Sequence, residues 1–169
     1  MNKIFLLLLL FCFVGCSNLN KVVYDEIAEK NILIDECNRA TFNIDEFEDW
    51  FYKEYSSYKP DAETLRKIEG QLFDFDILIV MGTWCHDSRR EVPRVFKILD
   101  HLAYHEPKIR LVNVDTKKRS SVIDTKKLDI QRVPTIIVYK DKEEVGRIIE
   151  TPVESLEKNL VKIISANLD

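Results

Sequence analysis

The sequence lacks a basic excess, a dense set of cysteines and a Cys-x-x-Cys pair. Twenty-five lysines and arginines stand against 29 acidic residues, which gives a formal net charge of −4. A nucleic-acid partner would require a clustered basic face, and the sequence shows none. We therefore expect no nucleic-acid partner, and nothing in the composition calls for a cofactor.

Long hydrophobic runs are also missing, except near the start of the chain. Residues 4–14 form an apolar run behind Lys3, but this run is about half the length that spans a bilayer. It has the form of a secretory signal, so we expect residues 1–15 to be removed. Their loss would delete one lysine and no acid, and would change the net charge to −5.

The apolar run ends in Phe13-Val14-Gly15-Cys16-Ser17, with small or apolar residues before a cysteine. This segment resembles the lipobox of bacterial lipoproteins, in which the cysteine becomes the first residue of the mature chain and carries lipid. The resemblance implies lipidation at Cys16 and an exported protein, anchored at the bacterial cell envelope with the periplasmic face favoured. A cleaved signal with a soluble product and an uncleaved anchor are the alternatives.

Four cysteines are present, and only two of them would remain as protein thiols. Cys12 would leave with the signal, and Cys16 would be modified by lipid. Cys37 and Cys85 would then lie in an exported compartment where disulfides persist. Two thiols are too few for a disulfide scaffold. They allow one internal pair, Cys37–Cys85, but an inert, partly buried Cys37 is the favoured interpretation.

The length of 169 residues suits one domain. Residues 18–30 are polar and weakly patterned, as in a tether or a first helix, and 31–35 could form a short strand. Asn43 and Glu46 then resemble a capping box before an amphipathic helix that extends to about Tyr58. Its aromatic face is expected to be buried in the core rather than to bind a ligand. A second helix is predicted from Pro60 to about Gly70.

From residue 75 the pattern becomes one of strands and helices in turn. Apolar runs predict four strands, and helical spacing predicts three helices. The strands are 75–81, 109–114, 134–139 and 144–149, and the helices are 88–104, 115–127 and 153–165. The short charged segment 140–143 fits an antiparallel hairpin. This order predicts a layered α/β domain with a mixed sheet.

Cys85 falls at the junction between the strand 75–81 and the helix that follows. Unpaired backbone N–H groups and the positive end of the helix dipole favour a thiolate there. Arg89, Arg90 and a protonated His86 would favour it further, whereas Asp87 would oppose it. The two arginines also suggest a nearby anion, although they could simply belong to a solvated face. A metal site made of Cys85, His86 and Asp87 is not expected, because adjacent residues rarely converge on one ion.

The segment Trp84-Cys85-His86-Asp87-Ser88, the proline at 93 and the later Val133-Pro134-Thr135 resemble the thioredoxin superfamily in their order along the chain. The resemblance covers about residues 70–166. It implies a three-layer sandwich, in which helices flank a mixed central sheet, preceded here by an N-terminal helical extension. It also implies that Pro134 is cis and faces Cys85 across a substrate groove. The backbone of Val133 would pair there with an extended segment of a client, the protein whose disulfide is attacked.

The resemblance also suggests boundaries along the chain. We expect a signal peptide at 1–15, a lipid-anchored tether and N-terminal segment at 16–40, a helical extension at 41–70 and a thioredoxin-like domain at 71–169.

Three departures from the family pattern concern release of the client. Ser88 replaces the second cysteine, which in thioredoxins attacks the mixed disulfide. Ile79 and Leu111 stand where the family carries a buried aspartate and its accompanying lysine. Cys85 would therefore act as a single nucleophile, with Ser88 donating a hydrogen bond to its thiolate.

We expect a membrane-tethered thiol–disulfide oxidoreductase whose mixed disulfide is resolved by an external thiol. Its partners would be exported proteins with accessible cysteines, together with a low-molecular-weight thiol or a redox protein as electron donor. Trp84, Cys85, His86 and Ser88 would form the catalytic group. The alternative is a redox-inactive or client-trapping binding module on the same fold.

Overall fold

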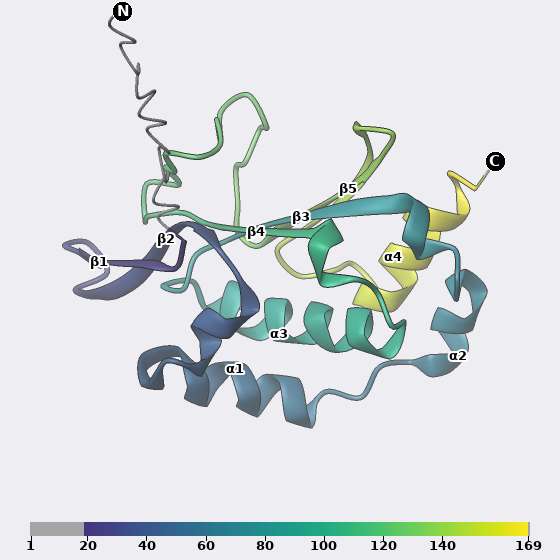
Figure 1. Cartoon of the computed structure of the whole chain (residues 1–169), viewed down its shortest axis with the longest axis horizontal. Helices are drawn as coiled ribbons and strands as arrows, with labels where there is room; N and C mark the ends of the chain where they lie inside the picture. The colour runs from purple at the N-terminus through teal and green to yellow at the C-terminus, as the bar shows by residue number, and fades with distance from the viewer. Residues whose placement is uncertain (1–18, 169) are drawn as a thin grey trace, which may run out of the picture.

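The computed structural model describes residues 19–168, in which helices pack against a six-stranded mixed sheet (Figure 1). The strand order is β1-β2-β4-β3-β5-β6, with β3 and β4 parallel and all other neighbours antiparallel. The strands are β1 (Lys21–Asp25), β2 (Lys30–Cys37), β3 (Phe75–Met81), β4 (Ile109–Asn113), β5 (Thr135–Lys140) and β6 (Glu143–Ile149). This mixed α/β architecture confirms the predicted fold class.

Four α-helices and four short 3-10 helices accompany the sheet. The α-helices are α1 (Asp45–Ser57), α2 (Ala62–Leu65), α3 (His86–His101) and α4 (Leu156–Ser165). The 3-10 helices are η1 (Arg39–Asn43), η2 (Arg66–Ile68), η3 (Leu72–Asp74) and η4 (Glu106–Lys108). Figure 1 shows α3 directly beneath the sheet and α1 beneath α3.

The most regular sequence patterns are confirmed. The apolar run 75–81 is β3, and the strand after it along the chain is β4 at 109–113. The hairpin between β5 and β6 turns at Asp141 and Lys142, whose φ angles are 53° and 71°. Positive φ at both central residues is the geometry that matches the twist of a two-residue hairpin.

The expected tether or first helix at residues 18–30 is wrong. Residues 21–25 form β1, which pairs antiparallel with β2 through a turn at 26–29. The carboxylate of Asp25 accepts hydrogen bonds from the N–H groups of Ile27 (2.9 Å) and Ala28 (2.8 Å). An aspartate that binds the backbone just after it favours a turn over a continuing helix.

The helix expected at 115–127 is also wrong, because residues 114–134 contain turns and bends without a helix. Asp115 accepts hydrogen bonds from the N–H groups of Lys117 and Arg119, and Asp124 does so from those of Lys126 and Lys127. These side chains take the backbone donors that a helix would use internally.

The predicted capping box at the start of α1 does not form. The residue that precedes the helix is Ile44, which provides no side-chain cap, and the Asn43 side chain instead accepts a hydrogen bond from the Tyr52 hydroxyl at 2.6 Å. The second predicted helix is present as α2 and η2. Asp61 caps it by accepting the Thr64 N–H, and Gly70 ends it with a φ of 76°.

Two apolar clusters lie on opposite faces of the sheet. The helix-side cluster contains Phe47 and Phe51 of α1, Leu33 of β2 and Ile79 of β3 among its members. The cluster on the other face contains Leu78, Val80, Val112, Val114, Ile130, Val133 and Ile137. Because β2 pairs with β4 and α1 packs into the helix-side cluster, the segments before residue 70 contribute to the same sheet and core as those after it.

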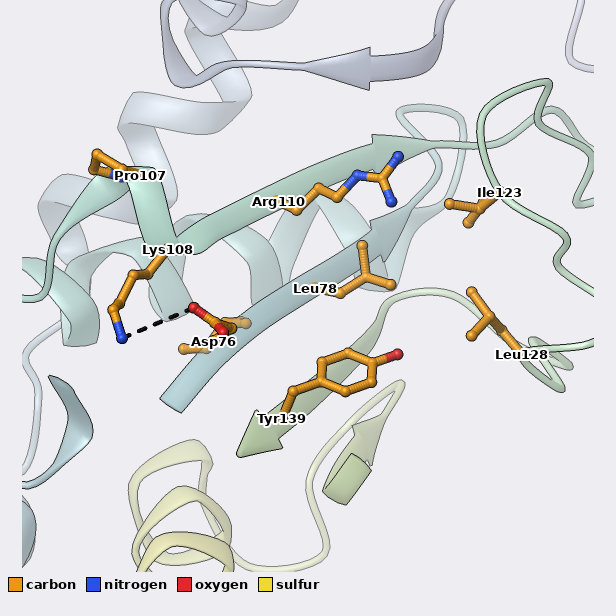
Figure 2. Close-up of a pocket in the computed structure, with 9 residues that line it drawn as sticks. Asp76, Leu78, Pro107, Lys108, Arg110, Ile123, Leu128 and Tyr139 are labelled. Atoms are coloured by element: carbon orange, nitrogen blue, oxygen red, sulfur yellow. Dashed lines mark ion pairs between the residues drawn. The ribbon is translucent and has the colours of Figure 1, made fainter. Parts of the chain in front are cut away.

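The missing helix leaves part of the second face open. A pocket of about 340 Å³ lies over the first residues of β3 and is lined by side chains of β3, β4, β5 and the 114–134 loop (Figure 2). Leu78 and Tyr139 lie on its sheet side, while Ile123 and Leu128 come from the loop. The pocket is at the end of β3 opposite the segment that leads to Cys85.

Candidate functional site

Cys85 is the N-cap residue of α3, four residues after the end of β3 at Met81. Its N–H donates to the carbonyl of Gly82 (2.9 Å), and its own carbonyl accepts the Arg89 N–H (3.1 Å), which is the first hydrogen bond of the helix. The Cys85 side chain is half-buried and carries a free thiol. The thiol therefore lies where the unpaired N–H groups of the first helical turn stabilise negative charge.

The segment 133–135 lies opposite this thiol. The Val133–Pro134 peptide bond is cis, as the resemblance implied, and the Cys85 thiol donates to the Val133 carbonyl at 3.2 Å. The Thr135 hydroxyl donates to the carbonyl of Arg132 at 2.7 Å. Residues 48 positions apart in the sequence thus meet at one place, because β5 begins beside the end of β3.

A surface hollow of about 410 Å³ adjoins the proline. It is lined by Gln131, Arg132, Ile149, Glu150 and Thr151. The Glu150 N–H donates to the Pro134 carbonyl at 2.7 Å, and the Glu150 carboxylate pairs with Arg132 at 2.7 Å. The hollow is therefore built on the same backbone that faces Cys85.

Trp84 packs its indole beneath the strand–helix junction. Its Nε1–H donates to the carbonyl of Val114 at 2.9 Å, which joins the junction to the residue after β4. Gly82 lies under this ring, and a Cβ at Gly82 would be only 2.5 Å from the indole nitrogen. A glycine is required there for the indole to keep its position.

Ser88 does not contact the thiol in the way that we expected. It is fully buried, and its hydroxyl accepts the Gly82 N–H at 3.2 Å. Between residues 19 and 168, no hydrogen bond joins Ser88 to Cys85. The hydroxyl satisfies a backbone donor of the loop 82–85, so its observed contact is structural.

The charged residues near Cys85 are paired mainly with each other. Arg90 binds Asp87 at 2.9 Å, the buried Glu91 at 2.6 Å and the Thr151 hydroxyl at 2.6 Å. The hydrogen bond that Arg90 donates to the Glu91 carboxylate raises the pKa of Arg90 above its usual range. We expected an anion near the two arginines, and for Arg90 this anion is provided by the carboxylates of Asp87 and Glu91. The His86 side chain is 85% exposed and 4.0 Å from Asp87.

Arg89 holds the loop before Cys85. Its Nε–H donates to the carbonyl of Thr83 at 2.7 Å, and its guanidinium lies 5.4 Å from the ring centre of Trp50 on α1. Thr83 is buried, and its hydroxyl accepts the N–H of Leu33 on β2 at 3.1 Å. Sequence reasoning missed Thr83 and Trp50 as supports of the site, because spacing gives no sign that β2 and α1 reach this loop.

Cys37 is buried in the helix-side cluster, whereas Cys85 packs against the cluster on the other face. Burial raises the pKa of the Cys37 thiol to about 11. Both thiols are free. Leu111 lies between Cys37 and Ile79 in the sheet register. Ile79 and Leu111, which replace the family's buried aspartate and lysine, therefore form an apolar row with Cys37.

Two histidines near the end of α3 have a spacing that occurs in metal sites. His101 and His105 are spaced as His-x-x-x-His, a pair that sequence reasoning overlooked, but α3 ends at His101 and Ala103 has a φ of 51°. Among residues 19–168, no group of three His, Cys, Asp or Glu side chains could hold a metal ion.

None of the helices between residues 19 and 168 has the length and apolar character required to cross a bilayer. Cys16 lies outside the described residues.

A thiol at the start of a helix, with a cis proline opposite it and a mixed sheet behind it, defines a thiol-redox class of α/β protein. No family model matches the sequence. Over 92 residues, however, the chain is 33% identical to thioredoxin AMT13 of Alternaria alternata, in a match that covers 54% of this chain and 70% of that protein. The chain belongs to the thioredoxin family, and its function is related to thiol–disulfide redox chemistry.

Solved structures resemble the chain more distantly. A Pseudomonas aeruginosa protein of unknown function is 18% identical, with 72% of this chain and 82% of that chain covered and a TM-score of 0.48. The thioredoxin of Fasciola hepatica is 20% identical, with coverage of 63% and 93% and a TM-score of 0.40. Mitochondrial thioredoxin 3 of Saccharomyces cerevisiae is 22% identical, with coverage of 67% and 98% and a TM-score of 0.39.

Proposed function

We propose that the protein is a membrane-tethered thiol–disulfide oxidoreductase that uses Cys85 as its single nucleophile. The main support is the Cys85 thiol itself, which lies at the start of α3 and 3.2 Å from the Val133 carbonyl that precedes the cis proline. A half-buried thiol at the start of a helix is accessible to a disulfide.

The proposed reaction begins with attack of the Cys85 thiolate on a client disulfide. A Cys85–client disulfide forms, the client S–S bond breaks, and the second client sulfur leaves as a thiolate that takes a proton from water. A low-molecular-weight thiol then attacks the Cys85 sulfur and releases the client as a dithiol. A second molecule of that thiol displaces Cys85 and leaves as the oxidised small disulfide, so two electrons pass from the small thiol to the client.

An external thiol is needed because neither candidate resolving group is suitable. Ser88 has no sulfur, and its hydroxyl binds the Gly82 N–H. Cys37 lies in the cluster on the opposite face of the sheet, and its pKa of about 11 keeps it protonated near neutral pH. The mixed disulfide would therefore persist until a small thiol or another redox protein arrives.

The client segment would lie along residues 133–135 and over the adjoining hollow. Val133 and Thr135 are buried, so a client would meet mainly their backbone and the exposed side chains of the hollow. Ile149, which is 44% exposed, offers an apolar contact beside the Arg132–Glu150 ion pair. We propose exported proteins with accessible disulfides as clients, which follows from the signal and lipobox patterns.

A turnover assay tests this proposal. The purified protein is incubated with a disulfide-containing test protein and glutathione, and the thiols produced are followed over time. The wild type and Cys37→Ser should turn over, whereas Cys85→Ser should be inactive. Loss of turnover in Cys37→Ser would overturn the single-nucleophile mechanism. If the wild type instead accumulates a mixed disulfide that glutathione does not release, the protein is a client-trapping module.

The tether is tested separately. Cells that express the full chain are labelled with a fatty-acid analogue, and the chain is recovered from membrane and soluble fractions. The wild type should carry the label and sediment with membranes, and Cys16→Ser should lose the label. Recovery of an unlabelled wild-type chain in the soluble fraction would exclude the lipid anchor and leave the redox proposal unaffected.

A further inference from the structure

The β1–β2 hairpin exposes an unusual share of the apolar side chains on the described surface. Eleven large apolar residues are exposed between residues 19 and 168, and four of them fall within residues 19–27. They are Leu19 (42%), Val22 (39%), Tyr24 (59%) and Ile27 (63%). Among the strands of residues 19–168, β1 lies at the edge of the sheet, with β2 as its one paired neighbour. Grouped exposed apolar residues at an edge indicate a contact surface.

The distance along the chain restricts what this surface can meet. Leu19 is only three residues after Cys16, the proposed lipidation site. Three extended residues span roughly 10 Å, so a lipid on Cys16 would hold Leu19 close to the headgroup region of the bilayer. The hairpin, which begins two residues after Leu19, cannot then be far from the same surface.

The charges of the hairpin decide which kind of bilayer fits. Between Lys21 and Cys37 the hairpin carries two lysines against five acids, which are Asp25, Glu26, Glu29, Asp35 and Glu36. Asp25 accepts a hydrogen bond from the Thr116 hydroxyl at 3.0 Å. The hairpin therefore has no excess of cations to attract anionic lipids. Its tyrosine and aliphatic side chains suit the interfacial region of a zwitterionic bilayer, where aromatic rings are enriched.

We propose that the β1–β2 hairpin rests on the bilayer surface through Leu19, Val22, Tyr24 and Ile27. This inference depends on the proposed tether at Cys16. It has a consequence for the redox site, because Leu33 of β2 binds Thr83, which is two residues before Cys85. The contact therefore holds the Cys85 end of the molecule near the membrane, where the accessible disulfides are those close to the lipid surface.

Fluorescence quenching by brominated lipids tests the contact. The full lipid-modified chain is placed in phosphatidylcholine vesicles with and without brominated acyl chains, which quench indoles that approach the bilayer. Tyr24→Trp adds an indole on the hairpin, and Tyr52→Trp adds one at an exposed position of α1 as the matched control. Trp50 and Trp84 contribute the same background to both variants.

The emission added by Tyr24→Trp should be mostly lost in brominated vesicles, and that added by Tyr52→Trp should be retained. Added phosphatidylglycerol should not increase the quenching, because the hairpin carries no cationic excess. A chain that floats with the vesicles but shows no quenching in Tyr24→Trp would overturn the hairpin contact while leaving the tether intact. A chain that does not float would overturn the tether, and the hairpin contact with it. Emission that depends on protein concentration would indicate a second copy on this edge instead, and would also overturn the proposal.

A second measurement follows the redox consequence. A pyridyl disulfide attached to lipid headgroups and a soluble pyridyl disulfide are offered to Cys85 in parallel. A long Gly/Ser insertion before Leu19 should slow the reaction with the lipid-bound disulfide and leave the soluble reaction unchanged. Equal slowing of both reactions would show that the insertion damages the site. If the insertion variant and the wild type react with the lipid-bound disulfide at the same rate, the membrane-proximal placement of Cys85 is overturned.

Discussion

In the proposed mechanism, the side chain at position 88 decides how a client is released. Ser88 stands where a second cysteine would release a client internally, and its buried hydroxyl accepts the Gly82 N–H. The backbone around it still has the form of a strand–helix junction that presents Cys85. In that mechanism, the difference between a one-thiol and a two-thiol cycle depends on position 88 and on Ile79 and Leu111, which are paired in the sheet register.

Ser88→Cys is expected to introduce internal release. A thiol at position 88 would attack the Cys85–client disulfide, so trapped mixed disulfides should decrease and turnover should depend less on added glutathione. Release should remain slow, because Ile79 and Leu111 provide no group to accept the proton. Non-reducing gels and an assay without glutathione measure both effects. Ser88→Ala is the control, with wild-type trapping and a loss of about 1 kcal/mol in stability. Equal trapping in Ser88→Cys and wild type would contradict the expectation.

The buried Cys37 thiol should make stability depend on pH in the alkaline range. Its pKa rises from 9.0 to about 11 on folding, so the unfolded chain loses this proton at a lower pH than the folded chain does. Its contribution to stability is complete below about pH 9 and is lost as the pH rises to about 11. At about 1.4 kcal/mol per pKa unit, the loss is of the order of 2 to 3 kcal/mol.

Urea denaturation of the wild type and Cys37→Ala at several pH values measures this loss. Near pH 8 the variant should be less stable because of the cavity that it leaves. The gap between the two proteins should close as the pH approaches about 11, since only the wild type carries the titrating thiol. A gap that stays constant over this range would show that Cys37 is not the titrating group.

Single residues of the site differed in how well the sequence predicted them. The position of Cys85 between a strand and a helix was predicted from the order of elements along the chain, whereas the places of Trp84 and Pro134 were implied by the family resemblance. In the structure the Cys85 thiol lies beside Val133, which precedes Pro134, and the Trp84 indole binds the Val114 carbonyl. The contacts of Arg89 and Ser88 were not predicted, because each depends on a backbone atom whose position is set by distant strands. Thr83 was missed for the same reason, since its partner Leu33 is 50 residues away.

At the scale of elements, α1 is part of the core rather than an attachment to it. Phe51 is fully buried and stacks on Phe42 of η1, with ring centres 4.1 Å apart. Both rings also contact Phe96 of α3. The helix that carries Cys85 at its start is therefore supported by an element that precedes the alternating strands and helices from residue 75 onward.

Phe51→Ala should lower the free energy of unfolding by about 3 to 5 kcal/mol, because it removes a fully buried ring and leaves a cavity. Tyr52→Ala, which truncates an exposed aromatic ring on the same helix, should cost less than about 1 kcal/mol. Chemical denaturation followed by circular dichroism provides both values. Similar small losses in the two variants would indicate that α1 contributes little to the fold.

The elements that sequence patterns predicted best are those with strong internal periodicity. β3 and α3 carry continuous or amphipathic apolar patterns, and both were predicted closely. The loop 115–127 has apolar residues at helical intervals, but Asp115 and Asp124 bind backbone N–H groups and override that weak pattern. β1 has too few residues to show a period, and it forms because β2 offers a pairing edge.

At the scale of the whole molecule, the two tryptophans report on different parts of one core. Trp50 packs against the helix-side cluster and Trp84 against the cluster on the other face. The sheet lies between them and belongs to both clusters. We therefore expect the segments before and after residue 70 to unfold together, even though the sequence suggested separate N-terminal, extension and thioredoxin-like parts.

Two variants test this cooperativity. Trp84→Phe leaves Trp50 as the fluorescent probe, and Trp50→Phe leaves Trp84. In each variant, the midpoint of urea unfolding by fluorescence should match the midpoint by far-ultraviolet circular dichroism. An earlier fluorescence midpoint in Trp84→Phe alone would show that the helical extension separates from the rest of the fold first.

The strand order also sets how the molecule would bear mechanical load. If a partner is held at Cys85 while the chain is fixed at its N-terminal end, tension enters at the outer strand β1 and leaves after the central strand β3. Within the sheet its path crosses three ladders, β1–β2, β2–β4 and β4–β3, and outside the ladders the Leu33–Thr83 hydrogen bond links β2 to the loop before Cys85. The middle ladder is the shortest, since on β2 it involves only Asp35–Cys37. Under such tension the sheet would part between β2 and β4, and the hairpin would stay behind with the anchor.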